Sequence, residues 1–192
     1  MKNFFLLITL LSIALCSSAQ SYSSNKFSKG NAFYDRIDLQ DEGGDIIVSV
    51  APKFYKQKDI KKRIKPIKVG GETFFIEKGK NGTQSVYAKN GEHVALMTRN
   101  GETIQIAGDL QKYALRPKLR LANYNVLECN DSEGMLVSTT SFKNDRRLTY
   151  EQKGEQNLLL MALCIHQYQE LLLGQRGKLS SINTVLNASH SF

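Results

Sequence analysis

The chain has 192 residues, a formal net charge of +8 and a hydrophobic fraction of 41%. This length is that of one domain with a substantial core, and the hydrophobic fraction excludes a chain that is disordered throughout. Beyond the N-terminal segment no apolar run approaches the ~20 residues that a membrane-spanning helix needs, so no transmembrane helix is predicted.

The first 19 residues have the pattern of a secretion signal. Lys2 precedes an apolar run at 4–16, and Ser17-Ser18-Ala19 supplies the small residues that a signal peptidase reads. We therefore expect residues 1–19 to be a signal peptide and the protein to be exported, either periplasmic or secreted. A lipid anchor at Cys16 is the alternative, but Leu15 occupies the position at which lipoproteins usually carry a small residue.

Two cysteines remain after such a cleavage, Cys129 and Cys164. An exported protein can form a disulfide between them. Both lie in apolar stretches of sequence, however, where a free buried cysteine is also common. The sequence leaves both states open.

Composition divides the rest of the chain into three parts. Residues 20–32 are rich in Ser, Asn, Lys and Gly, and we expect them to be disordered. Residues 33–174 form a single predicted domain, and the polar residues 175–192 form a predicted flexible tail. The domain opens with a partly acidic loop and an apolar strand at 46–50. The acidic residues lack the alternating spacing of an EF-hand, so no metal site is predicted.

Three Asn-Gly pairs, at 81–82, 90–91 and 100–101, are the clearest sign of regular structure. Asn-Gly supplies the two positive-φ residues of a type I′ turn, so the pairs predict a meander of β-hairpins. With two-residue turns, one face of this meander collects most of the apolar residues. The predicted core face comprises Val86, Ala88, His93, Ala95, Met97, Ile104 and Ile106.

Further strands are predicted at 73–77, 110–115, 118–128 and 135–142, and a helix is predicted over 155–173. Residues 158–165 of this helix (LLLMALCI) are all apolar, and a helix that is apolar on every side has to be enclosed. The sequence therefore predicts a mainly β fold, an antiparallel β-barrel or curled sheet that encloses a hydrophobic C-terminal helix. The alternative is a lipocalin-like barrel with an external helix.

The helix segment at 156–165 (QNLLLMALCI) and the meander at 74–106 are similar to elements of the tubby C-terminal-like superfamily, in its LURP-one-related and scramblase-like branch. The chain resembles that superfamily in the style and order of these elements over residues 45–174. The resemblance implies a barrel of roughly twelve strands around a C-terminal helix, and association with lipid or a membrane surface. Tubby's phosphoinositide-binding residues and the acidic calcium segment of scramblases have no counterpart here, so no functional residue is carried over.

The strongest charge feature is a basic run at 53–68, which has eight cations in sixteen residues and Asp59 as its carboxylate. Ile60, Ile64 and Ile67 interleave with the charges at a spacing that suits a short amphipathic helix. We predict an exposed site for anionic lipid headgroups or acidic glycans, formed by Lys56, Lys58, Lys61, Lys62, Arg63, Lys65 and Lys68. The alternative is a solvated loop that keeps the protein soluble. No nucleic-acid-binding motif accompanies the charge, so no nucleic-acid partner is predicted.

No catalytic constellation is recognisable in the sequence. His93, His166 and His190 have no metal-ligand spacing, and Cys164 lies on a different face of the predicted helix from His166. No nucleophile elbow or phosphate-binding glycine loop is visible. We therefore expect no cofactor, and a non-enzymatic binding or structural protein of the cell envelope that associates with an anionic surface. The alternative is a lipocalin-like carrier of an apolar small molecule.

Overall fold

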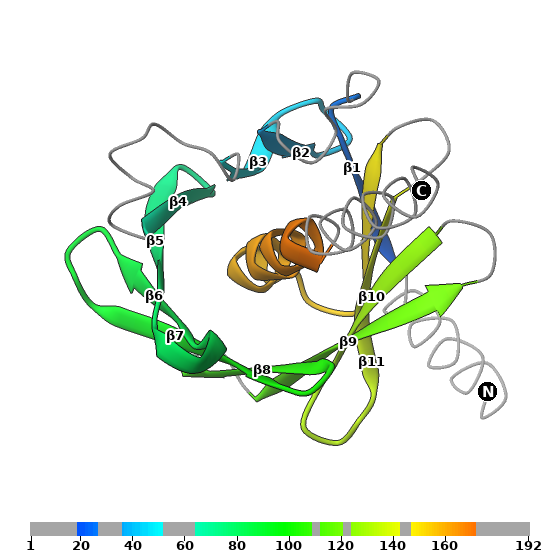
Figure 1. The fold of residues 1–192 in the computed structure, drawn as a ribbon. Coiled ribbons are helices and arrows are strands. Elements are labelled where there is room, and N and C mark those ends of the chain that lie inside the picture. The colour runs from blue at the N-terminus through cyan, green and yellow to red at the C-terminus, as the bar shows by residue number, and fades with distance from the viewer. Residues whose placement is uncertain are drawn as a thin grey trace, which may run out of the picture.

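The structure, a computed structural model, describes residues 19–26, 36–51, 64–108, 112–120, 124–142 and 147–171. Within these residues, twelve antiparallel strands form a closed barrel in which sequence neighbours pair and β1 joins β12. A helix at residues 158–171 lies inside the ring of strands (Figure 1). The predicted mainly β fold that encloses a hydrophobic C-terminal helix is confirmed.

Successive strands run in opposite directions, so the chain connections alternate between the two ends of the barrel. A 3-10 turn, η1, joins β5 to β6. The bounds are β1 Gln20–Ser24, β2 Ile37–Gln40, β3 Ile46–Val50, β4 Ile64–Val69, β5 Glu72–Lys78, η1 Lys80–Gly82, β6 Gln84–Ala88, β7 His93–Asn100, β8 Thr103–Gly108, β9 Tyr113–Arg120, β10 Tyr124–Asn130, β11 Leu136–Phe142 and β12 Leu148–Gln152.

β1 closes the barrel by pairing with β12 on one side and β2 on the other, and Ser23 lies opposite both Thr149 and Gln40. The prediction of disorder is therefore wrong for residues 20–24, and residues 27–32 lie outside the described residues. The polar sequence of β1 does not have the pattern of a strand. Backbone hydrogen bonds to its two neighbours, and not an apolar face, hold β1 in the sheet. β2 likewise lies within the segment predicted to be an acidic loop.

In the meander formed by β5 to β8, most of the residues that were predicted to face the core are buried. These buried residues are each at most 4% exposed: Val86, Ala95, Met97, Ile104 and Ile106. The first Asn-Gly pair has both predicted positive angles, with φ of 55° at Asn81 and 76° at Gly82. The connection around this pair is nevertheless longer than two residues, because Lys78 pairs with Gln84. At 100–101 only Gly101 has a positive φ, and Asn100 pairs with Thr103, so the turn lies one residue later than predicted. Strand alternation is therefore confirmed for most of the core face, whereas the predicted two-residue Asn-Gly turns are wrong in detail.

His93 lies on the exposed outer face, so its predicted place on the core face is wrong. At 90–91 only the glycine has a positive φ, and the turn is longer than the two-residue type I′ turn that was predicted. A bulge at Val86/Tyr87 then sets His93 opposite Tyr87. The two rings pack edge to face with 5.4 Å between their centroids.

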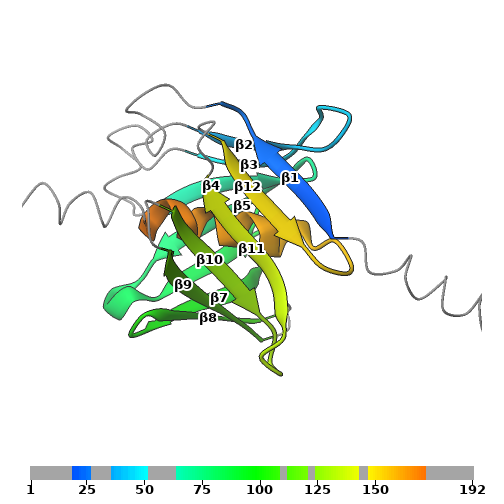
Figure 2. The same cartoon turned by 90° about the vertical axis from the view of Figure 1, so that its right-hand side faces the viewer.

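The helix passes through the interior, and residues 160–169 are buried on every side. Figure 2 shows it between β10–β12 and the opposite wall of the barrel. Asn157 caps its N-terminus, because Oδ1 of Asn157 accepts a 2.9 Å hydrogen bond from the Leu160 N–H. The cap explains a start at 158 rather than at the predicted 155. The alternative of an external, lipocalin-like helix is therefore wrong.

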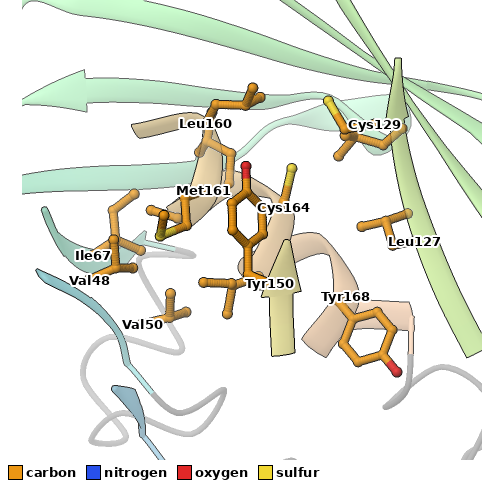
Figure 3. Packing of buried hydrophobic residues seen from close by; sticks show 14 of the residues in the cluster. Val48, Val50, Ile67, Leu127, Cys129, Tyr150, Leu160, Met161, Cys164 and Tyr168 are labelled. Atoms are coloured by element: carbon orange, nitrogen blue, oxygen red, sulfur yellow. The ribbon is translucent and has the colours of Figure 1, made fainter. Parts of the chain in front are cut away.

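Side chains of the helix and the wall form a single core (Figure 3). Met161 packs on the side of Val48, Val50 and Ile67, and Cys164 on the side of Cys129. Full burial of a large apolar side chain contributes about 1.5–3 kcal/mol to stability. The helix is therefore a central part of the core that holds the barrel together.

Leu163→Ala should lower the free energy of unfolding by about 2–5 kcal/mol, because Leu163 is fully buried and its truncation leaves a cavity inside the barrel. Leu96→Ala makes the same change on the outer face, where Leu96 is 37% exposed, and should cost less than about 1 kcal/mol. Urea unfolding followed by circular dichroism measures both losses. Equal losses would contradict an enclosed helix.

Candidate functional site

Lys65 and Lys68 are the predicted anion-binding residues that lie in the described part of the chain, and both are on β4. Lys68 is exposed, but Lys65 is half-buried and its Nζ donates a hydrogen bond to Oε1 of Gln169 in the helix. Lys65 shares the inward parity of Ile67, so its predicted place on an exposed face is wrong. Ile64 and Ile67, whose spacing suited a helix, lie on a strand at 64–69, and Ile60 lies outside the described residues. Lys56, Lys58, Lys61, Lys62 and Arg63 lie outside the described residues.

Lys65 belongs to a group of polar side chains inside one end of the barrel, here called the polar cluster. Its members come from β4, β5 and β6 and from the second half of the helix: Lys65, Lys78, Gln84, His166, Gln167, Gln169 and Glu170. Lys78 Nζ and Glu170 Oε2 form an ion pair at 2.5 Å. Polar contacts thus join the helix to the wall at this end.

His166 is fully buried in the polar cluster and is neutral. Burial lowers its pKa well below the usual value, and the charges of Lys65 and Lys78 act in the same direction. Its Nε2 lies 2.8 Å from Oε1 of Gln84, which also accepts a 3.0 Å bond from Gln167. Because Oε1 only accepts, Nε2 of His166 carries the proton. The buried Nδ1 is then an acceptor without a partner among the described residues.

A pocket of about 210 Å³ opens at the rim of the barrel beside the polar cluster. Its lining includes Lys78, Gln84, Arg99, Gln167 and Glu170. Arg99 is exposed and forms no ion pair with another residue that the structure describes. A space of about 10–15 Å³ on this measure holds one water, so the pocket has ample room for a carboxylate or phosphate group. Guanidinium and amide donors can bind the oxygen atoms of such an anion.

The two ends of the barrel differ in charge. The helix begins at the end where Leu158 lies against Gly70 in the turn between β4 and β5. With residues up to one position inside a strand end included, this acidic end carries nine described carboxylates and four lysines, among them Lys68 of the predicted anion-binding site. The carboxylates are Asp41, Glu42, Asp45, Glu72, Glu92, Asp131, Glu133, Glu151 and Glu155, and the lysines are Lys68, Lys89, Lys112 and Lys153.

The opposite end, here called the basic end, holds the polar cluster and the pocket. Its described residues include seven cations, Lys26, Arg36, Lys65, Lys78, Lys80, Arg99 and Arg147, and four carboxylates, Asp38, Glu77, Glu102 and Glu170. β3 ends and β4 begins at this end. The segment 52–63, whose sequence has six cations and one carboxylate, is therefore joined to the barrel here.

The sequence reasoning missed Lys78, Gln84 and Arg99. Lys78 has the same parity as Ile76, and Gln84 the same as Val86, so strand alternation alone places both toward the interior. Polar residues at inward positions near strand ends are a signal of a polar barrel mouth. Arg99 carries the same signal, because it shares the parity of Ala95 and Met97 near the end of β7 and lines the pocket beside Met97.

No protein family, curated protein or solved structure matches this chain. In the described ranges, no three or more His, Cys, Asp and Glu side chains gather so that they could hold a metal ion. The helix that the structure describes is not long and apolar enough to cross a membrane. The geometry and charge of the barrel ends are therefore the basis for a functional proposal.

The neutral state of His166 should make stability depend on pH. Below about pH 6.5 the unfolded chain binds a proton at this histidine that the folded protein does not, so unfolding becomes easier as pH falls. The contribution of His166 to this slope should approach about 1.4 kcal/mol per pH unit as pH falls below 6.5, and His166→Gln should remove that contribution.

Urea unfolding at several pH values measures this slope. Glutamine keeps an N–H donor for Gln84, and His93→Gln is the matched control because it removes an exposed histidine instead. If His93→Gln reduces the slope as much as His166→Gln does, the assignment to the buried imidazole is wrong.

Proposed function

We propose that this protein is a non-enzymatic binding protein of the cell envelope that docks end-on, through its basic end, on an anionic lipid surface. The opposite charge of the two barrel ends is the observation that carries the proposal. An anionic surface attracts one end and repels the other, so the electrostatic energy is lowest with the basic end toward the lipid. The resemblance to tubby-like domains, which implies membrane association, supports the same proposal.

Lys80 and Arg99 are the described residues best placed for contact, because both are exposed at the rim of the basic end. The neighbouring pocket has room for one anionic group of a headgroup. Lys65 is not proposed as a contact, since its Nζ bonds to Gln169 inside the barrel. Lys56, Lys58, Lys61, Lys62 and Arg63 are proposed as further contacts, because the segment that contains them is joined to this end.

The export expected from the signal-like N-terminal sequence supports a role in the cell envelope. β1 begins at Gln20, the residue after the proposed cleavage site, so removal of residues 1–19 leaves every described strand intact. The alternative function, a carrier of an apolar molecule, has no comparable support. A carrier needs an open interior. Residues 160–169 of the helix occupy that position in this barrel.

Replacement of Lys80 and Arg99 by Gln in one variant should weaken binding to phosphatidylserine-containing vesicles by roughly 30-fold, at about 1 kcal/mol for each lost charge. Vesicle flotation at low ionic strength, with neutral phosphatidylcholine vesicles for comparison, measures the effect. The matched control replaces Lys89 and Lys112 by Gln, which removes the same charge from the acidic end. It should leave binding within about twofold of wild type.

An equal loss in the two double variants would mean that net charge alone drives binding, and end-on docking would be wrong. Failure of the wild-type protein to float with anionic vesicles would refute the lipid proposal itself. Retention on an acidic glycan resin without vesicle binding would assign the basic end to glycans instead.

A further inference from the structure

Two cysteines meet where the helix passes the barrel wall. Cys164 lies on the helix and Cys129 on β10, and each is 1% exposed. Both belong to the same buried core cluster, and Cys164 interacts with Cys129 and with Ser138 of β11. Figure 3 shows both sulfur atoms in the space between the helix and this side of the wall. Both residues are free thiols in the structure.

This setting does not suit a reactive cysteine. The hydrogen bond with Cys129, followed by burial, raises the pKa of the Cys164 thiol well above its usual value. A catalytic or metal-binding cysteine needs a stabilised thiolate and access to solvent. A structural disulfide needs the opposite, two sulfur atoms held together in a packed site that reductants reach poorly.

We propose that Cys129 and Cys164 form a disulfide in the oxidised protein, and that this bond fastens the central helix covalently to β10. The proposal does not rest on anion binding. It requires an oxidising compartment, which is the one expected for an exported chain. Whether the two cysteines are a disulfide or two thiols therefore depends on whether the chain folded under oxidising conditions.

A small disulfide such as oxidised glutathione can serve as the oxidant. The thiolate of one cysteine attacks it, which forms a mixed disulfide and releases one glutathione thiolate. The second cysteine attacks the protein sulfur of that mixed disulfide and releases the other glutathione. The cysteine pair loses two electrons and two protons, and the two glutathione thiols gain them. Because the folded site is buried, the exchange takes place before the helix is enclosed or during an opening of the barrel.

The bond would close a loop between residues 129 and 164, which contains β11, β12 and the first half of the helix. Closing a loop of this length restricts the unfolded chain and stabilises the folded state. The helix would then leave the barrel only if the wall opened with it. The helix and the wall should therefore unfold together, and the gain in stability should appear in the unfolding of the whole protein.

The test uses the full chain carrying Cys16→Ser, so that Cys129 and Cys164 are the remaining thiols. The chain is refolded with oxidised and reduced glutathione, or with dithiothreitol, and is then unfolded and alkylated. Oxidation should protect both cysteines from alkylation, lower the mass by about 2 Da and yield a peptide that links residues 129 and 164. It should also raise Tm by about 10 °C, reversibly with dithiothreitol.

Cys129→Ala and Cys164→Ala, each made alone, should show the same Tm under both conditions. The thiol count on the parent chain needs neither variant to fold, so it decides the first part of the proposal alone. Two alkylated cysteines after oxidative refolding would overturn the disulfide. A linked pair with an unchanged or lowered Tm would overturn its role in fastening the helix.

Discussion

Mutual burial of the helix and the barrel is the constraint on which the rest of the structure depends. A closed sheet of about eight strands is already wide enough for its inward side chains to fill, so twelve strands leave central space unfilled. An α-helix with its side chains measures about 10–12 Å across and can fill that space. The helix needs the barrel equally, because residues 160–165 are apolar on every side and buried. Neither element is stable with its apolar surface in water, so closure of the sheet and enclosure of the helix have to occur together.

The second half of the helix shows what this enclosure demands of the wall. His166, Gln167 and Gln169 are buried, and a buried polar group destabilises the fold unless it is hydrogen-bonded. The wall supplies partners at inward positions near strand ends, namely Lys65 and Gln84. Some cations of the basic end therefore serve the interior, whereas Lys80 and Arg99 are exposed at its rim. Within the basic run, strand parity separates Lys65, which shares the inward parity of Ile67, from the exposed Lys68.

The sequence was sufficient for features that depend on local patterns. The apolar run LLLMALCI predicts an enclosed helix, and alternation in the meander predicts most of its core face. It was insufficient where pairing between distant strands overrides local composition. β1 is polar and is a strand only because β2 and β12 flank it, and His93 changes face because a bulge alters the register beside its turn. The polar cluster joins residues 65, 78, 84 and 166, whose meeting depends on the register of two strand pairs, β4 with β5 and β5 with β6, and on the place of the helix.

A barrel filled by its own helix has to present its binding groups on the rim or the outer wall, and packing inside the barrel controls how firmly they are held. Lys80 lies in η1, directly after β5, and Arg99 lies near the end of β7. The inner residues of these two strands, Ile76 and Met97, are packed in the core with the helix. The ion pair between Lys78 and Glu170 ties the same rim directly to the helix. Rigid support of this kind reduces the entropy that rim side chains lose on binding, so the enclosed helix contributes to recognition without contacting the ligand. At the acidic end, the partial positive charge of the helix N-terminus lies toward the surrounding carboxylates, so the helix also favours the observed division of charge between the ends.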